Sequence, residues 1–211
     1  YLKDVKKETI TKVELQLIID VVNAVEQVKN NPTDDNIQRL NDLLAGLDPN
    51  AQIVKDTKQQ VNGSILDTIN GDFTNVTEKQ LENIGINDLI TSRLPQYQDA
   101  LEEYAKEHDP KDLTVDDIQK VIDAINGVQD AKDNPTADTI RNAHDAVNNL
   151  DDGALKDKLL QELEDITIEY IVNNPGAITE ELFDFANLDT DSSRMDSYIE
   201  YLNDVLPGMP K

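Results

Sequence analysis

Leu113-Thr114-Val115-Asp116-Asp117-Ile118-Gln119 repeats the pattern of Ile10-Thr11-Lys12-Val13-Glu14-Leu15-Gln16, which stands 103 residues earlier in the chain. The two stretches align without a gap as far as Asp48 and Asp151, and 15 of the 39 aligned positions are identical. An ungapped run of this length indicates a tandem duplication. Residues 10–48 are called the first copy below, and residues 113–151 the second copy.

Both copies open with the signals of a capped, amphipathic helix. Thr11 and Thr114 stand three residues before an acid, as in a capping box. Apolar residues follow at helical spacing, so a stripe of them is expected to face the core. The stripe consists of Leu15, Ile18, Ile19, Val22 and Val25 in the first copy, and of Ile118, Val121, Ile122, Ile125 and Val128 in the second.

A shared Asn-Pro-Thr sequence, at residues 31–33 and 134–136, is expected to end the first helix of each copy. Proline disfavours the helical conformation in the residue before it, and the threonine can cap the helix that follows. Thr77 and Thr179 mark the start of shorter helices, and one more helix is expected near the end of each half. The second and third helices are expected at residues 34–45 and 53–69, and at residues 137–149 and 155–172.

The sequence therefore predicts an all-α fold with two tandem homologous helical-bundle modules of about five helices each. The first module is assigned to residues 1–109, the second to residues 110–206, and residues 207–211 to a C-terminal linker. The joint at residues 108–112 is polar and contains proline, so we expect the modules to fold separately. Because the chain begins at Tyr1, we expect it to be a fragment of a longer protein whose signal or anchor lies outside it.

Charge and composition disfavour several classes of function. The formal net charge is -24, from 43 acidic and 19 basic residues, and residues 110–211 carry 23 of the acids. A general basic surface for nucleic acid or an anionic membrane is therefore disfavoured. The lack of cysteine excludes disulfides, thiolate catalysis and cysteine-ligated zinc. No stretch approaches the roughly 18–20 apolar residues of a membrane span, so we expect no membrane insertion. The lack of a basic surface leads us to expect no nucleic-acid partner.

The sharpest local pattern is the acidic stretch from Asp189 to Glu200. Numbered as a twelve-residue EF-hand loop, it offers Asp189, Asp191, Ser193 and Glu200 as ligands for calcium, the one cofactor that the sequence suggests. However, Arg194 stands where the EF-hand turn needs glycine, and the first half of the chain lacks the pattern. The alternative interpretation is a solvated acidic loop in which Asp191 or Ser192 caps the last helix.

Residues suited to catalysis are present without an evident catalytic arrangement. Adjacent acids such as Glu180-Glu181 are expected in a chain that is one-fifth acidic, and most of them lie at helix starts, where the macrodipole favours them. We assign His108 to the joint and His144 to a helix surface, at the position where the first copy has Asn41. The tyrosines of the last helix in each half are expected at helix seams: Tyr97, Tyr104, Tyr198 and Tyr201. We therefore predict that the chain is not an enzyme.

The pattern Thr-x-x-acid-Leu/Ile-Gln-x-x-Ile-Asp-x-x-Asn, which begins at Thr11 and Thr114, is followed in both copies by Asn-Pro-Thr and a second acidic helix. This pattern resembles the α-helical tandem-repeat modules of large Gram-positive bacterial cell-surface proteins, of the S-layer-associated or adhesin-like type. The resemblance implies an extracellular location at the cell surface, with other modules of the same protein as partners. It concerns scaffold positions only and assigns no catalytic residue.

We expect a non-catalytic structural region that acts as a stalk, spacer or lattice component. One alternative is an adhesin-like module that binds a host or cell-wall ligand through a helix face. Another is an intracellular acidic inhibitor that mimics nucleic acid. A sizeable exposed apolar patch would favour the binding module over the spacer, and a deep polar pocket around His144 would favour an enzyme.

Overall fold

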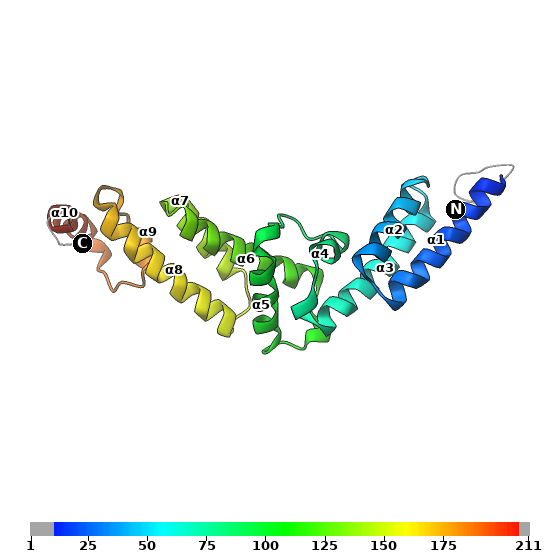
Figure 1. Cartoon of the computed structure of the whole chain (residues 1–211). Helices are drawn as coiled ribbons and strands as arrows, with labels where there is room; N and C mark the ends of the chain where they lie inside the picture. Colours follow the sequence, from blue (N-terminus) through cyan, green and yellow to red (C-terminus); the bar gives the residue numbers. More distant parts are fainter. Residues whose placement is uncertain (1–10, 207–211) are drawn as a thin grey trace. The chain divides into compact units, whose positions relative to one another are not determined.

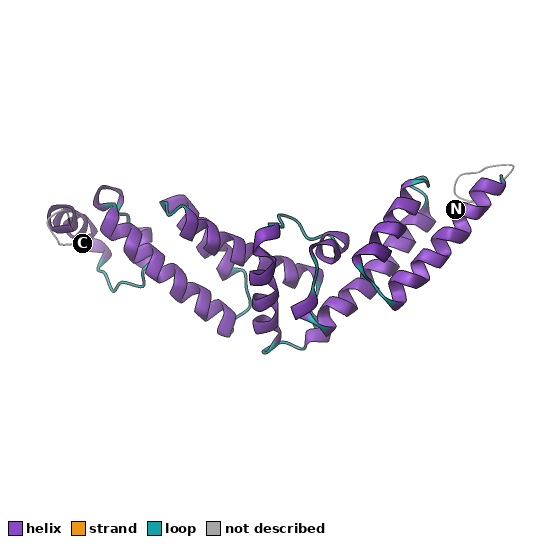
Figure 2. Cartoon of the chain, in the orientation of Figure 1, coloured by secondary structure: helices purple, strands orange, loops and turns teal. Residues whose placement is uncertain are grey.

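The computed structural model describes residues 11–206, and within that range the chain forms helices and loops with no strand (Figures 1 and 2). The prediction of an all-α fold is therefore confirmed. The stretch 166–172, which is rich in β-formers, lies inside a helix. The C-terminal linker assigned to residues 207–211 lies outside the described residues.

The chain divides into two compact units, and the boundary in the sequence falls between Ile118 and Gln119. The described part of unit 1 contains α1 (Lys12–Asn30), α2 (Asp34–Ala45), α3 (Gln52–Gly71), η1 (Phe73–Asn75), α4 (Glu78–Ile84), η2 (Thr91–Arg93), α5 (Leu94–Ala105) and η3 (Pro110–Asp112). In this unit α1 packs on α2 and α3, α3 packs on α4, and α5 packs on the 3₁₀ turn η1. Their buried aliphatic residues, among them Ile37, Ile65 and Leu81, form its core.

The second half of the chain continues with α6 (Val115–Asp133), α7 (Ala137–Asn148), α8 (Ala154–Asn173), η4 (Pro175–Ala177), α9 (Glu180–Phe185), η5 (Ser192–Arg194) and α10 (Met195–Val205). Within unit 2, α8 packs on α7 and α9, and α10 packs on η4 and η5. The longest helices have the same lengths as their counterparts: α1 and α6 have 19 residues, α2 and α7 have 12, and α3 and α8 have 20.

Threonine caps set the helix starts as expected. Thr11 and Glu14 form a capping box, and Asp117 closes the same box with Thr114, because its Oδ2 accepts from the Thr114 N–H at 3.0 Å. Thr77 and Thr179 cap α4 and α9 in the same way through their hydroxyl oxygens. These side chains satisfy backbone N–H groups that the first turn of a helix leaves without partners.

The predicted core stripe is correct for the second copy and wrong for the first. In α6, Ile118, Val121, Ile122 and Val128 are buried. In α1, three of the five predicted residues, Leu15, Ile19 and Val22, are 49%, 46% and 58% exposed, and Ile18 and Val25 are half-buried. The reason is that α1 carries a second apolar stripe, formed by Val21, Ala24 and Val28, and this stripe is the one that is buried in unit 1.

The joint between the two predicted modules is folded and packed. Pro110–Asp112 forms η3, which packs on α3, and the carbonyl of Leu113 accepts a 2.9 Å hydrogen bond from the buried Asn70 amide. The His108 ring stacks on Tyr104 with the ring centroids 4.1 Å apart. Residues 110–118 thus belong to unit 1, although the sequence assigned them to the second module.

Candidate functional site

An open, shallow cleft of about 460 Å³, with a partly apolar lining, lies beside His144 in unit 2, between α7, α8 and α9. Acidic and amide side chains line much of it, including Asp157, Glu164 and Asp184. Titratable groups and a buried histidine meet in this one concavity, which makes it a candidate site for small-molecule chemistry.

The assignment of His144 to a helix surface is wrong, because the side chain is buried and stacked on Phe185. The two ring centroids lie 4.0 Å apart and the planes differ by 10°. Burial lowers the pKa of His144, and the nearby carboxylates of Asp145 and Glu181 counteract this shift only in part. Nε2 is buried and has no hydrogen-bond partner, so His144 sits at the wall of the cleft as a neutral packing ring.

The equivalent place in unit 1 is built from amides instead of rings. Asn41, which aligns with His144, donates a 2.9 Å hydrogen bond to Asn83 on α4, and Asn83 donates another to Asn62 on α3. A cleft of about 510 Å³ lies beside this amide chain. The two halves therefore use the same positions to tie helices together, but they fill them with different chemistry.

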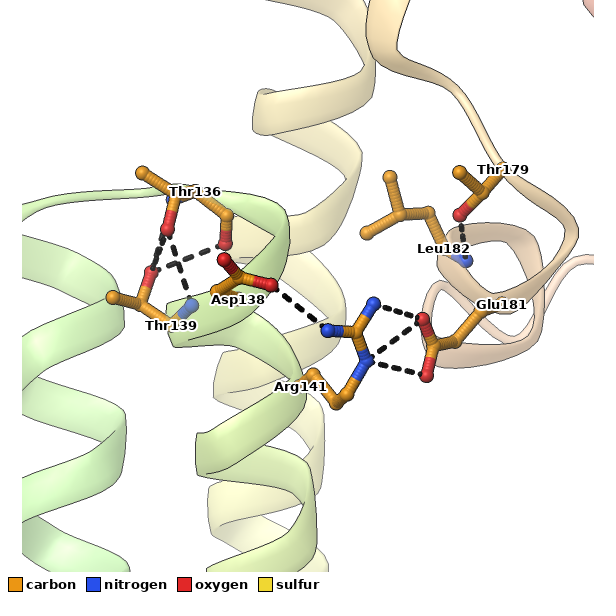
Figure 3. A network of polar contacts seen from close by, with 7 residues as sticks. All are labelled: Thr136, Asp138, Thr139, Arg141, Thr179, Glu181 and Leu182. Carbon is orange, nitrogen blue, oxygen red and sulfur yellow. Dashed lines mark hydrogen bonds and ion pairs between the residues drawn. The ribbon is translucent and has the colours of Figure 1, made fainter.

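A second contact between helices also occupies equivalent positions in the two halves and differs in its chemistry. Arg141 on α7 clasps Glu181 on α9: its Nε donates to both carboxylate oxygens, at 2.8 and 3.0 Å, and its Nη2 donates at 2.6 Å (Figure 3). The hydrogen bonds from Arg141 lower the pKa of Glu181. In unit 1 the equivalent positions hold Gln38 and Lys79, joined by a 2.8 Å hydrogen bond from Lys79 Nζ.

Helix caps lie on both sides of the Arg141–Glu181 ion pair. Arg141 also donates to Asp138 in the first turn of α7, where Thr136 and Thr139 bond to each other and to the backbone (Figure 3). On the other side, Thr179 caps α9 through the Leu182 N–H. The Arg141 and Glu181 side chains are each about two-fifths exposed, so this ion pair fixes the contact between α7 and α9 more than it adds stability.

The proposed calcium ligands are not gathered around a common point. Asp191 Oδ1 accepts from the backbone N–H of Ser193 at 2.9 Å and from its hydroxyl at 2.7 Å, and these bonds lower the pKa of Asp191. Glu200 lies well inside α10, which starts at Met195. Across residues 11–206, no group of three or more acidic or histidine side chains is close enough to hold a metal ion. The geometry is that of a cap, and calcium binding at Asp189 stays a prediction.

The tyrosines follow the seam prediction in unit 1 but not throughout unit 2. Tyr97 and Tyr104 are buried, and the Tyr97 hydroxyl accepts from the Ile90 N–H at 3.2 Å. Tyr198 is half-buried, whereas Tyr201 is largely exposed. The seam assignment is therefore wrong for Tyr201, which lies on a face of α10 that unit 2 leaves open.

Unit 1 also contains an apolar groove that was not predicted from the sequence. It has a volume of about 270 Å³ and lies between α1, α2 and α3, where Ile18, Val22 and Ile53 help to line it. Val22 also belongs to the exposed stripe of α1, so groove and stripe form one apolar region. A signal was present in the sequence, because a 19-residue helix with apolar residues on two faces has more than one surface to cover.

No described helix has the length and apolar character that crossing a bilayer requires. No protein-family model, curated protein or solved structure matches the chain.

Proposed function

We propose that this chain is a non-catalytic spacer region of a bacterial cell-surface protein, built from two tandem homologous modules. Its task would be to hold apart whatever is attached at its two ends. The surface location rests on the resemblance of the repeated sequence to Gram-positive surface-protein modules. The spacer role rests on the internal repetition, which lengthens a chain without needing a new fold.

The observation that carries the proposal is what recurs between the two halves and what does not. Helix lengths, threonine caps and the positions of contacts between helices recur. The chemistry of those contacts does not: Gln38–Lys79 corresponds to Arg141–Glu181, and Asn41–Asn83 corresponds to His144–Phe185. Positions that only hold helices together tolerate such exchanges, whereas a reacting site needs particular groups in fixed geometry.

The connection between the units also favours a spacer. The boundary falls inside α6, so the chain passes from one unit to the next within a helix and not through a loop. Helical connections act as stiffer spacers than flexible loops do. A spacer benefits from such a connection, because its length is then defined.

The spacer role can be tested on the full chain with two spin labels. The chain has no cysteine, so Gln59→Cys on α3 and Glu169→Cys on α8, both exposed positions, provide the only two thiols. Double electron–electron resonance in dilute solution should give one narrow distance distribution. A broad distribution would mean that the units move independently, and the spacer proposal would then fail.

The surface location needs its own test. An antibody raised against the chain should label intact, unpermeabilised cells of the source organism. Labelling that requires permeabilised cells would contradict this part of the proposal and would favour the intracellular acidic inhibitor.

One observation favours a second candidate, a binding module. The exposed stripe of α1 and the adjoining groove form the kind of apolar surface that marks an interaction site. A spacer that binds nothing along its sides would not need this apolar surface. The two functions are compatible if the partner of this surface is another module.

A further inference from the structure

We propose that the cleft beside His144 binds an organic cation whose ammonium groups are spaced along an alkyl chain, as in a polyamine or in the side chains of neighbouring lysines. The carboxylates of the cleft pair with the ammonium groups, and Nε2 of His144 accepts a hydrogen bond from one of them. This binding site goes beyond the spacer role and does not depend on it.

The cleft holds negative charge that the chain itself does not neutralise. Asp157 and Glu164 on α8 and Asp184 on α9 line it, and none of the described lining residues is basic. Among the described residues, none of these three carboxylates has a hydrogen bond or an ion pair. By contrast, Glu181, three residues before Asp184, is paired with Arg141. Unpaired carboxylates that line one concavity attract a cation from solution.

A buried nitrogen in the wall of the cleft points independently to a ligand with N–H groups. The His144 side chain lines the cleft and is only 6% exposed, and its Nε2 has no hydrogen-bond partner. Burial lowers the pKa of His144, so the ring is neutral at about pH 7.5. With its proton on Nδ1, a neutral imidazole has an acceptor at Nε2, and a buried acceptor without a partner is unfavourable. Asn41, the equivalent residue of unit 1, has its partner in Asn83.

The equivalent cleft of unit 1 is lined by a cation of the chain itself. Counted from the start of each helix, Lys58 on α3 stands at the place of Leu160 on α8, and both residues line their clefts. Glu82 stands at the place of Asp184 and is the single acid among the described residues that line the unit 1 cleft. Unit 2 thus has more acids at this place and lacks the lysine, and a bound cation supplies the missing charge.

The size and the walls of the cleft favour an extended organic cation over a metal ion. No three acidic or histidine side chains within residues 11–206 are close enough to hold one metal ion together. The volume of about 460 Å³ lies in the range of small-molecule sites. Leu160 and Phe185 give the cleft apolar surface, on which methylene groups can pack while the charged ends stay with the carboxylates.

The test measures binding of spermidine to the full chain by isothermal titration calorimetry at about pH 7.5. The buffer contains about 0.15 M NaCl, where the Debye length is about 8 Å and general attraction to the acidic surface is screened. The cleft variant combines Glu164→Gln with Asp184→Asn. The matched control combines Asp165→Asn with Glu169→Gln, which removes two charges at exposed positions of α8 outside the cleft.

The wild-type chain and the matched control should bind spermidine at one saturable site with equal affinity. The cleft variant should bind at least about tenfold more weakly, because it loses two charge-assisted hydrogen bonds. His144→Phe keeps an aromatic ring against Phe185 but removes the acceptor, so it should weaken binding at least about twofold. Its melting temperature should equal or exceed that of the wild type, which separates loss of binding from loss of structure.

Nuclear magnetic resonance follows the His144 nitrogen directly. The chain has two histidines, so the imidazole ¹⁵N signals are resolved and His144→Phe assigns them. Saturating spermidine should shift the Nε2 signal of His144 and leave the signals of His108, which belongs to unit 1, unchanged.

A trilysine peptide, titrated in the same way, distinguishes the two sources of the cation. Tighter binding of spermidine assigns the cleft to a free polyamine, and tighter binding of trilysine assigns it to the lysines of a partner protein.

Three results would overturn the inference. The first is the absence of saturable binding by both probes. The second is equal affinity of the cleft variant and the matched control, which means that spermidine binds the acidic surface in general. The third is an unchanged His144 signal at saturation. The spin-label distance does not depend on this cleft, so the spacer proposal can fail or survive independently of this test.

Discussion

Ile19 and Ile122 occupy the same repeat position in two helices of equal length, yet one side chain is 46% exposed and the other is fully buried. Replacing Ile122 by alanine removes buried methyl groups and leaves a cavity, which costs about 2–5 kcal/mol for such a change. Replacing Ile19 by alanine opens no closed cavity, because about half of the side chain is already in water. We expect a loss of about 1 kcal/mol there, since burying an isoleucine fully stabilises by about 1.5–3 kcal/mol.

The assay is urea denaturation of the dilute full-length chain, followed by circular dichroism at 222 nm. The helix propensity gained on changing isoleucine to alanine is the same at both sites, so it cancels in the comparison. The free energy of unfolding of the unit concerned should fall at least twice as far for Ile122→Ala as for Ile19→Ala. Equal losses at the two sites would refute the claim that the first copy leaves its stripe open.

Three further predictions concern other parts of the chain. Gly127→Ala should destabilise unit 2 by about 1–3 kcal/mol, because the added Cβ would lie 3.0 Å from Ala143 Cα. Gly63→Ala has no atom within 4 Å of the added Cβ and should stabilise its helix by about 0.5–1 kcal/mol. Thermal melts that rank the two variants the other way would contradict the close packing of α6 on α7 at Gly127. Burial holds the folded-state pKa of His144 below 6.5, so the stability that its neutral form contributes is present above pH 6.5 and is lost on acidification towards the folded-state pKa. His144→Asn should therefore lose less stability between pH 7.5 and 5.5 than the wild type. Equal losses would refute the description of His144 as a buried neutral ring. If Asp191 acts only as a cap, Ca²⁺ and Mg²⁺ at matched ionic strength should raise the melting temperature equally, with or without Asp189→Ala; a rise specific to Ca²⁺ that Asp189→Ala abolishes would restore the EF-hand interpretation.

Local signals in the sequence were sufficient for the helices. Thr33 and Thr136 start α2 and α7 through their own hydroxyls, so the helix starts follow from side chains three residues away. Pro32 and Pro135 end the preceding helices α1 and α6 for an equally local reason, because proline disfavours the helical conformation of the residue before it. Such features depend on a few neighbouring residues, which the sequence displays directly.

Burial could not be predicted from the same patterns, because it depends on which surfaces meet. Periodicity identifies an apolar face but not the partner that covers it, and α1 has two such faces. His144 was likewise assigned to a surface because its partner, Phe185, lies 41 residues away in the chain. The joint at residues 108–112 contains no strongly apolar residue. It belongs to unit 1 because η3 packs on α3 and because the adjacent Leu113 is buried and accepts a hydrogen bond from Asn70.

The central claim is that the chain contains one fold twice, and a crystal structure of the full chain tests it most directly. The backbones of residues 12–45 and 115–148 should superpose as the same helix pair, and Thr33 and Thr136 should both have extended backbone conformations at the start of the second helix. A strand in either segment, or a chain that continues as one uninterrupted helix through Pro32 or Pro135, would contradict the claim and would remove the basis for the spacer.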